Sequence, residues 1–292
     1  MKKFHIDKAF WIIGSAVILL AILLALLDKS GHLLQGWLAY ALLFALGAAS
    51  IYGVWRAVGA SRKATTIALL ALILRLGIGV ALTLLLPVFG YKDSQEHQAG
   101  YVYTDAYLRD NQAYSLAVSG QPILNAFSGQ LPGDQYGGML AISAFIYRFL
   151  SPDAHRPFLI LILGAVAATW GVLCLWKASN SWFGEKTALF AAWLFALYPE
   201  SVLLGSSQMR EAIVIPLTAL TFYGVTAITN HLRQGWFWIL LSAIILFPIQ
   251  PLVSFISLAV LFGVWVFDPT TLPILRNKRT ILAIFPWRAY FL

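Results

Sequence analysis

The sequence predicts an all-α polytopic membrane protein, and three observations support this fold class. First, 60% of the 292 residues are hydrophobic and only 11% are charged, whereas soluble domains carry roughly 25% charged residues. Second, apolar runs recur at lengths suited to membrane-spanning helices of about 20 residues. Third, the basic residues concentrate in alternate connecting segments, as cytoplasmic loops do. A mean hydropathy of +0.78 excludes a soluble enzyme, a secreted module and a disordered chain.

Apolar runs define the expected spans in chain order. They cover residues 9–27, 33–55, 65–89, 157–176, 187–204 and 211–229. The basic N-terminus precedes the first run, but no small-residue cleavage site follows, so this run is expected to remain as a helix. Two shorter runs, 236–247 and 252–267, predict helices joined by a tight turn, because Pro248 and Pro251 together interrupt a helix.

The segment Gly138–Leu150 is apolar but has only 13 residues, too few to cross ~30 Å of hydrocarbon. If it does not span, one side of the membrane holds 12 of the 20 Lys and Arg residues and three of the 12 acids. If it does span, the later basic loops move to the other side. The positive-inside rule favours the first topology and places Gly138–Leu150 at the interface or as a re-entrant segment.

This topology creates a large extracytoplasmic loop over residues 90–156, which holds six of the 12 acids. Within it, Thr104 or Asp105 can cap a short amphipathic helix whose acids face water. A solvated surface helix without further function fits the same pattern. Nearby tyrosines offer either a stacking surface for a sugar or an interfacial aromatic belt; they are Tyr101, Tyr103, Tyr107 and Tyr114.

A second, short outer loop covers residues 198–210, and Glu211 follows it. A carboxylate at the start of a helix is stabilised by the helix dipole, which explains Glu211 without invoking function. Its position nevertheless brings Glu211 to the membrane face that carries Asp105. Two carboxylates meeting there can share a general-base role and metal binding.

Four features in series resemble the GT-C superfamily of polyprenyl-phosphate-sugar glycosyltransferases. They are Asp105, the pattern Ala-x-x-Leu-Ala-x-x-Gly at 113–120, the pattern Pro-Gly-x-x-Tyr-Gly-Gly at 132–138, and Tyr-Pro-Glu…Arg-Glu at 198–211. The subgroup that the chain resembles includes protein O-mannosyltransferases and the lipid A aminoarabinose transferases. The resemblance covers about residues 70–224. It implies a transmembrane helix bundle whose first large extracytoplasmic loop is catalytic and carries juxtamembrane helices.

The resemblance also implies roles for individual residues. Asp105 occupies the position of the essential acid and Glu211 that of the second acid, with a divalent cation (Mg, Mn or Zn) left open. Family members often have two adjacent acids at the first position, but here Ala106 follows and the next acid is Asp110. Asp110 therefore stays an alternative base, although the spacing to 113–120 favours Asp105. Tyr107 and Tyr136 are further candidates for substrate binding.

Arginines at the outer face are candidates for binding the phosphate of a lipid-linked donor, because guanidinium groups pair with phosphate oxygens in bidentate geometry. Arg156 and Arg210 lie at predicted helix ends on that face, where each can also be an ordinary interfacial charge. Arg75 lies within a predicted span and either binds a lipid phosphate or snorkels. The chain has no nucleotide-binding or triad motif, and its one cysteine, Cys174, excludes an intramolecular disulfide.

We therefore expect an inverting membrane glycosyltransferase of the plasma (inner) membrane that transfers a sugar from a polyprenyl-phosphate donor to a hydroxyl of a lipid, glycan or protein. Membrane lipids, and no nucleic acid, are the other expected partners. Residues 1–64 would form two extra N-terminal helices, and residues 65–292 the GT-C-like module, either truncated at its C-terminal end or limited to the catalytic membrane half. A transporter or flippase and a non-catalytic GT-C-like scaffold remain alternatives; the absence of internal repeats disfavours the transporter.

Overall fold

The structure is a computed structural model that describes residues 2–129, 131, 133–230, 232 and 234–267. All regular secondary structure in these residues is helical, which confirms the predicted all-α class. The first three helices are α1 (Lys2–Asp28), α2 (Leu33–Val58) and α3 (Arg62–Phe89). The large loop contains α4 (Gln95–Gln98), α5 (Thr104–Val118), the 3₁₀ turn η1 (Ile123–Phe127) and α6 (Gly138–Leu150). The rest consists of α7 (Phe158–Leu197), α8 (Pro199–Gly205), α9 (Glu211–Thr229), α10 (Gln234–Ile249) and α11 (Pro251–Phe267).

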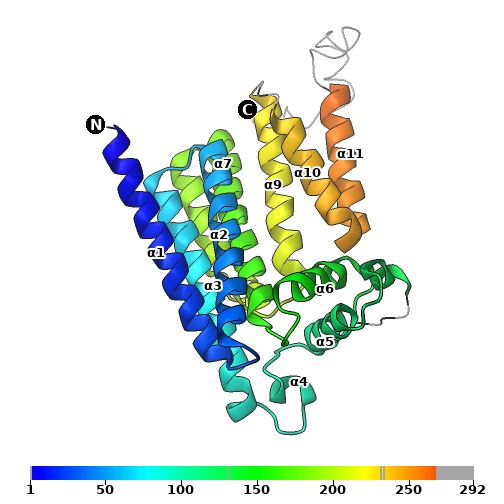
Figure 1. The fold of residues 1–292 in the computed structure, drawn as a ribbon. Helices are drawn as coiled ribbons and strands as arrows, with labels where there is room; N and C mark the ends of the chain where they lie inside the picture. The colour runs from blue at the N-terminus through cyan, green and yellow to red at the C-terminus, as the bar shows by residue number, and fades with distance from the viewer. Residues whose placement is uncertain (1, 130, 132, 231, 233, 268–292) are drawn as a thin grey trace.

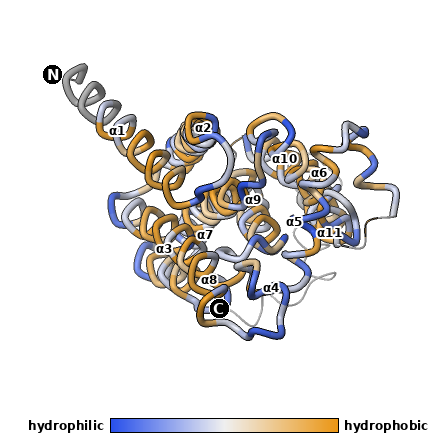
Figure 2. Tube along the Cα trace, turned by 60° about the horizontal axis from the view of Figure 1, so that its bottom comes forward, coloured by the Kyte–Doolittle hydropathy of each residue, from blue (hydrophilic) through white to orange (hydrophobic). Residues whose placement is uncertain are grey.

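Five helices in the described part are long and apolar enough to cross a membrane, namely α1 from Trp11 onward, α2, α3, α7 and α9. The chain is therefore a multi-pass membrane protein. Large apolar side chains on the outer helices face outward, for example Leu19 on α1 and Ile73 on α3. Figure 2 shows this distribution, with hydrophobic helices and hydrophilic connecting segments. Lipid can solvate such side chains where water cannot.

The helix α7 is bent back on itself and supplies two of the predicted spans. At Gly184 the backbone has φ 81° and ψ 170°, which interrupts the helical conformation within a 40-residue helix. This region of φ favours glycine because a side chain would clash with the backbone. The two arms lie against each other, since a side-chain carbon at Gly171 would be only 2.9 Å from Phe195 Cζ. The predicted second span ends earlier than expected, at Leu197, because Pro199 starts the separate helix α8.

The prediction for the two proline-separated segments is confirmed: α10 and α11 are distinct helices that meet at Gln250. The segment Gly138–Leu150 also forms the expected 13-residue helix, α6. In Figure 1, α6 and α5 lie across one end of the spanning helices instead of alongside them. The arrangement agrees with the prediction that α6 does not cross the membrane.

One buried core extends through both parts of the predicted domain division. α2 packs against α7, and Tyr40 of α2 is fully buried. The first arm of α7 is central, because α3 and α9 both pack on α7. This packing places three segments at the same end of the bundle in Figure 1: the α1–α2 turn, the 90–156 loop and the 198–210 loop.

Candidate functional site

A buried carboxylate, Asp110 on α5, is the centre of a hydrogen-bonded cluster in the large loop. Asp110 is only 3% exposed. The hydroxyl groups of Tyr101 and Tyr147 donate to its two oxygens at 2.5 and 2.6 Å. The imidazole Nε2 of His155 lies 2.9 Å from Asp110 Oδ2. The cluster thus joins α5 to α6 and to the loop that precedes α7.

These contacts determine the hydrogen positions. An ionised carboxylate only accepts hydrogen bonds, so His155 donates through Nε2–H and its Nδ1 is the acceptor in the neutral ring. Burial, and secondarily the charge of Asp110, raise the pKa of Tyr101 and Tyr147 well above the usual value for tyrosine. Both phenols therefore remain protonated donors at any physiological pH.

His155 is the one member of this hydrogen-bonded cluster that is substantially accessible. Its side chain is 24% exposed, against 3% for Asp110. Its ring stacks on Tyr114 with 4.7 Å between ring centroids and meets Tyr147 edge-on at 5.0 Å. The carboxylate and the two aromatic rings fix the imidazole in one orientation. Such an arrangement can present a base to an external hydroxyl group.

Asp105, the favoured base in the sequence analysis, lies elsewhere. It is exposed in the first turn of α5. Among the described residues, its carboxylate has no hydrogen-bond or ion-pair partner. Asp110 lies five positions further along the helix, which turns the two carboxylates about 140° apart at 100° per residue. The structure therefore distinguishes a buried, oriented aspartate from an exposed one. Tyr107, between them, contacts the ring of Tyr101 edge-on at 5.6 Å.

A second group of polar side chains lies next to the Asp110 cluster and includes three of the predicted site residues. Arg210 lies over the ring of Tyr136 at 5.9 Å, and its Nε is 3.4 Å from Glu211 Oε1. The other carboxylate oxygen, Glu211 Oε2, is buried and has no partner in the described part of the chain. Arg210, Tyr136 and Glu211 thus come together as the sequence suggested for a substrate site.

Arg109 connects the two groups. Its guanidinium is 4% exposed and donates through Nη2 to the carbonyl of Gln208. Burial lowers the pKa of Arg109, and the nearby charge of Arg210 acts in the same direction. Three carboxylates oppose that shift, in decreasing order those of Asp134, Asp110 and Glu211. The pair Arg109–Arg210 therefore lies within electrostatic reach of both the Asp110 cluster and Glu211.

The predicted phosphate-binding role of Arg156 requires correction. Arg156 is 1% exposed, and every N–H of its guanidinium already faces an acceptor within the chain. Nη1 and Nη2 bind both oxygens of Asp153, and Nε lies 3.6 Å from Asp28 Oδ2. The remaining acceptors are Ser151 Oγ and the carbonyls of Ser30 and His32. Arg156 has no donor left for a phosphate. Its hydrogen bonds connect the α1–α2 turn to the α6–α7 loop.

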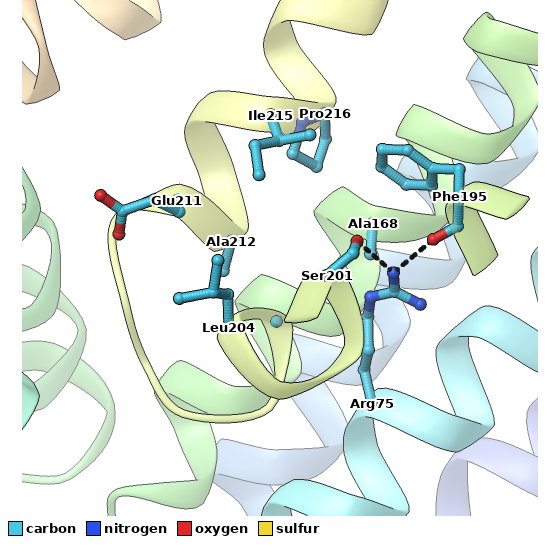
Figure 3. A pocket seen from close by; sticks show the side chains of 10 residues that line it. Arg75, Ala168, Phe195, Ser201, Leu204, Glu211, Ala212, Ile215 and Pro216 are labelled. Atoms are coloured by element: carbon cyan, nitrogen blue, oxygen red, sulfur yellow. Dashed lines mark hydrogen bonds between the residues drawn. The ribbon is translucent and has the colours of Figure 1, made fainter. Parts of the chain in front are cut away.

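Arg75 likewise has a structural position. It donates to the carbonyls of Phe195 and Ala196, in the last turn of α7, and to Ser201 Oγ of α8. A cation at the C-terminal carbonyls of a helix is favourable. Arg75 also lines a pocket with an empty volume of about 220 Å³, beside apolar residues of α8 and α9. In Figure 3 the carboxylate of Glu211 points away from Arg75, so this pocket does not join the two charges.

Asp105 and Glu211, the candidate ligands if the site holds a divalent cation, do not come together as a metal site. Within the described residues, no group of three or more His, Cys, Asp or Glu side chains is arranged to hold one. Asp105 is exposed without partners, whereas Glu211 already contacts Arg210.

Sequence reasoning missed Tyr147 and His155. The five histidines lack the spacing of metal ligands, and His155 is 45 positions from Asp110, so no local pattern connects them. A search against family models, curated proteins and solved structures finds no match to this chain.

Proposed function

We propose that this chain is a membrane glycosyltransferase that transfers a sugar from a polyprenyl-phosphate donor to a hydroxyl acceptor at the extracytoplasmic face. The observation that carries the proposal is the Asp110–His155 pair, a buried carboxylate that orients a partly exposed imidazole. Such a pair suits removal of a proton from a hydroxyl group. Its place at the end of the bundle suits a donor that stays in the bilayer.

The reaction needs three events, and the chain's residues can serve each. His155 Nδ1 takes the proton of the acceptor hydroxyl, and Asp110 stabilises the resulting imidazolium. The acceptor oxygen then forms a bond to the anomeric carbon while the bond from that carbon to the phosphate oxygen breaks. The leaving phosphate takes the electron pair of that bond. Arg210, with Arg109 behind it, would stabilise the developing negative charge.

Asp110, and not Asp105, is the carboxylate that we assign to the site, where it orients the base His155. A positioned base must be held in one geometry, and Asp110 has three hydrogen-bond donors whereas Asp105 has none. Glu211 keeps an accessory role, because it holds Arg210 and has one unpartnered oxygen. Tyr136, under Arg210, offers an aromatic face for the sugar ring.

The test is sugar transfer by the full chain in liposomes, with polyprenyl-phosphate sugars as donors and mass spectrometry of the glycosylated products. We expect His155→Gly to abolish transfer and added imidazole to restore a part of it. A purely structural histidine would not respond to imidazole in this way. Absence of transfer for every donor offered, together with unchanged surface glycans and lipids in cells lacking the gene, would contradict the proposal.

The proposed sidedness has its own test. Single cysteines at Ser128, in the large loop, and at Glu185, beside the turn in α7, are introduced into a Cys174→Ser background. Cys174 is buried, and both new positions are exposed. We expect a membrane-impermeant thiol reagent to label only the Ser128 position from outside intact cells. Labelling of both positions from the same side would mean that α6 spans the membrane.

A further inference from the structure

The segment 206–208, between α8 and α9, is held in an unusual conformation. Gln208 has φ +59°, a backbone region that residues other than glycine rarely adopt. One contact holds it there: its carbonyl accepts a hydrogen bond from Arg109. Strained residues that the surroundings hold in place occur mainly at functional sites.

Two polar atoms of this segment are buried without partners. Gln208 Oε1 and Ser206 Oγ make no hydrogen bond in the described part of the chain. The side chains are 6% and 2% exposed. Buried polar atoms are nearly always paired, because an unpaired one loses its hydration without compensation. The neighbouring Ser207 differs, since its hydroxyl donates to the carbonyl of Leu203.

Gln208 and Ser206 line one pocket, together with Tyr101 and Thr83. It lies between the end of α3, the 100–102 loop and the 206–208 segment, and its empty volume is about 190 Å³ including the open mouth. None of the lining residues is charged. Tyr101 separates the pocket from Asp110, to which its hydroxyl donates. The pocket is therefore a neutral, polar recess next to the proposed catalytic pair.

The two unpartnered atoms have complementary requirements. Gln208 Oε1 can only accept a hydrogen bond, because an amide oxygen carries no hydrogen. Ser206 Oγ can donate or accept. An alcohol group can meet either requirement, because it can donate to Gln208 and can accept from Ser206. A phosphate or carboxylate would meet Oε1 with a second acceptor and would find no cation in the recess.

We propose that this pocket, which has room for about one water-sized group, is a subsite for one hydroxyl group of the transferred sugar, and that Gln208 and Ser206 select for it. This inference rests on the proposed function, because it takes the ligand to be a sugar presented to the Asp110–His155 pair. A site built to hydrogen-bond a hydroxyl discriminates strongly against the analogue that lacks it, since the buried polar atoms are then left unpaired.

The experiment measures binding, not transfer. The full chain in nanodiscs is titrated with a polyprenyl-phosphate hexose and with each of its mono-deoxy analogues. We expect one analogue to bind roughly tenfold more weakly than the parent. Ser206→Ala should reduce this difference in affinity to about twofold or less. Gln208→Asn should also reduce it, and asparagine tolerates the same backbone region as Gln208. Ser207→Ala is the matched control and should keep the wild-type ratio.

The outcomes separate this inference from the proposed function. If the difference in affinity between the parent donor and its deoxy analogue disappears in Ser206→Ala, the subsite is supported, even if no acceptor is ever glycosylated. A different result overturns the subsite and leaves the transferase proposal intact. In that case the wild type transfers sugar, but Ser206→Ala and Ser207→Ala show the same affinity ratio between the parent donor and its deoxy analogue. Equal affinity for the parent and all deoxy analogues means that the recess holds water only. No binding of any lipid-linked hexose overturns both.

Discussion

Two clusters of charged residues lie at the same end of the bundle, and they differ in how completely their hydrogen bonds are made. Around Arg156, every N–H of the guanidinium faces an acceptor, and both oxygens of Asp153 are bound. Around Arg210, one oxygen of Glu211 and the amide oxygen of Gln208 are buried and unpartnered. In the first cluster the charged groups are all paired, and only the hydroxyl of Ser30 is buried without a partner in the described part of the chain. In the second cluster a carboxylate oxygen is itself unpaired.

This difference shows that burial of charge alone does not identify a functional site. The sequence made Arg156 and Arg210 equivalent, since both lie at helix ends in outer loops. Only the pairing separates them: Arg156 stabilises the fold, whereas Arg210 is partly exposed and contacts Glu211 weakly at 3.4 Å. Buried polar atoms without partners are therefore the better guide to where a substrate binds.

The largest expected effect is on catalysis. Asp110→Asn should reduce the rate of sugar transfer by about 10²–10⁴-fold, because the amide cannot hold His155 in the required tautomer or stabilise its charge. Asp105→Asn, a change at an exposed residue of the same helix, should leave the rate within about twofold of wild type. The measurement is the initial rate in liposomes at equal amounts of folded protein.

The reverse pattern would identify Asp105 as the base. Full activity in both variants would remove the aspartates of α5 from the mechanism and would make the Asp110 cluster a structural feature like that of Arg156.

The next effect is on stability. Arg156→Ala should lower the free energy of unfolding by about 3–5 kcal/mol, because Asp28 and Asp153 lose the cation that compensates them. Arg210→Ala should cost under about 1 kcal/mol, since the Arg210–Glu211 contact is partly exposed. Unfolding in mixed micelles measures both. A destabilisation of similar size in the two variants would erase the distinction between the clusters.

A smaller effect concerns acid stability. The hydrogen bonds from Arg156 lower the pKa of Asp153 well below its usual value. Asp153 therefore contributes stability above the pKa of its unfolded form, about 3.9, and this contribution is lost as the pH falls through the lower folded value. Asp153→Asn should flatten the decline of stability below about pH 5.

The smallest predicted effect is on donor affinity. Tyr136 provides a ring face for Arg210 at 5.9 Å, and such contacts contribute roughly 0.5–1 kcal/mol at exposed sites. Tyr136→Leu should therefore weaken binding of a polyprenyl-phosphate donor by about two- to fivefold. Phe at the same position should behave as wild type, because it keeps the ring. An unchanged affinity in Tyr136→Leu would exclude this ring from the donor site.

The sequence was sufficient for features that depend on local composition. The lengths of the apolar runs predicted the spanning helices. Pro248 and Pro251 predicted the turn between α10 and α11, and the 13-residue length of α6 predicted that it does not span. Contacts between distant segments could not be predicted in the same way. The Asp110–His155 pair joins residues 45 positions apart, and the Arg156 contacts with Ser30 and His32 cross more than 100 positions. Such pairs depend on how the helices pack.

The short helix α10 has a consequence for the surrounding bilayer. Its 16 residues extend about 24 Å at 1.5 Å per residue, less than the ~30 Å of hydrocarbon in a typical membrane. A helix that is too short draws the lipid headgroups inward around it. α6 packs against α10, at the end of the bundle that carries Tyr147. We therefore expect a local dip of the membrane surface beside α6, through which a lipid phosphate reaches the Asp110 cluster without leaving the headgroup layer.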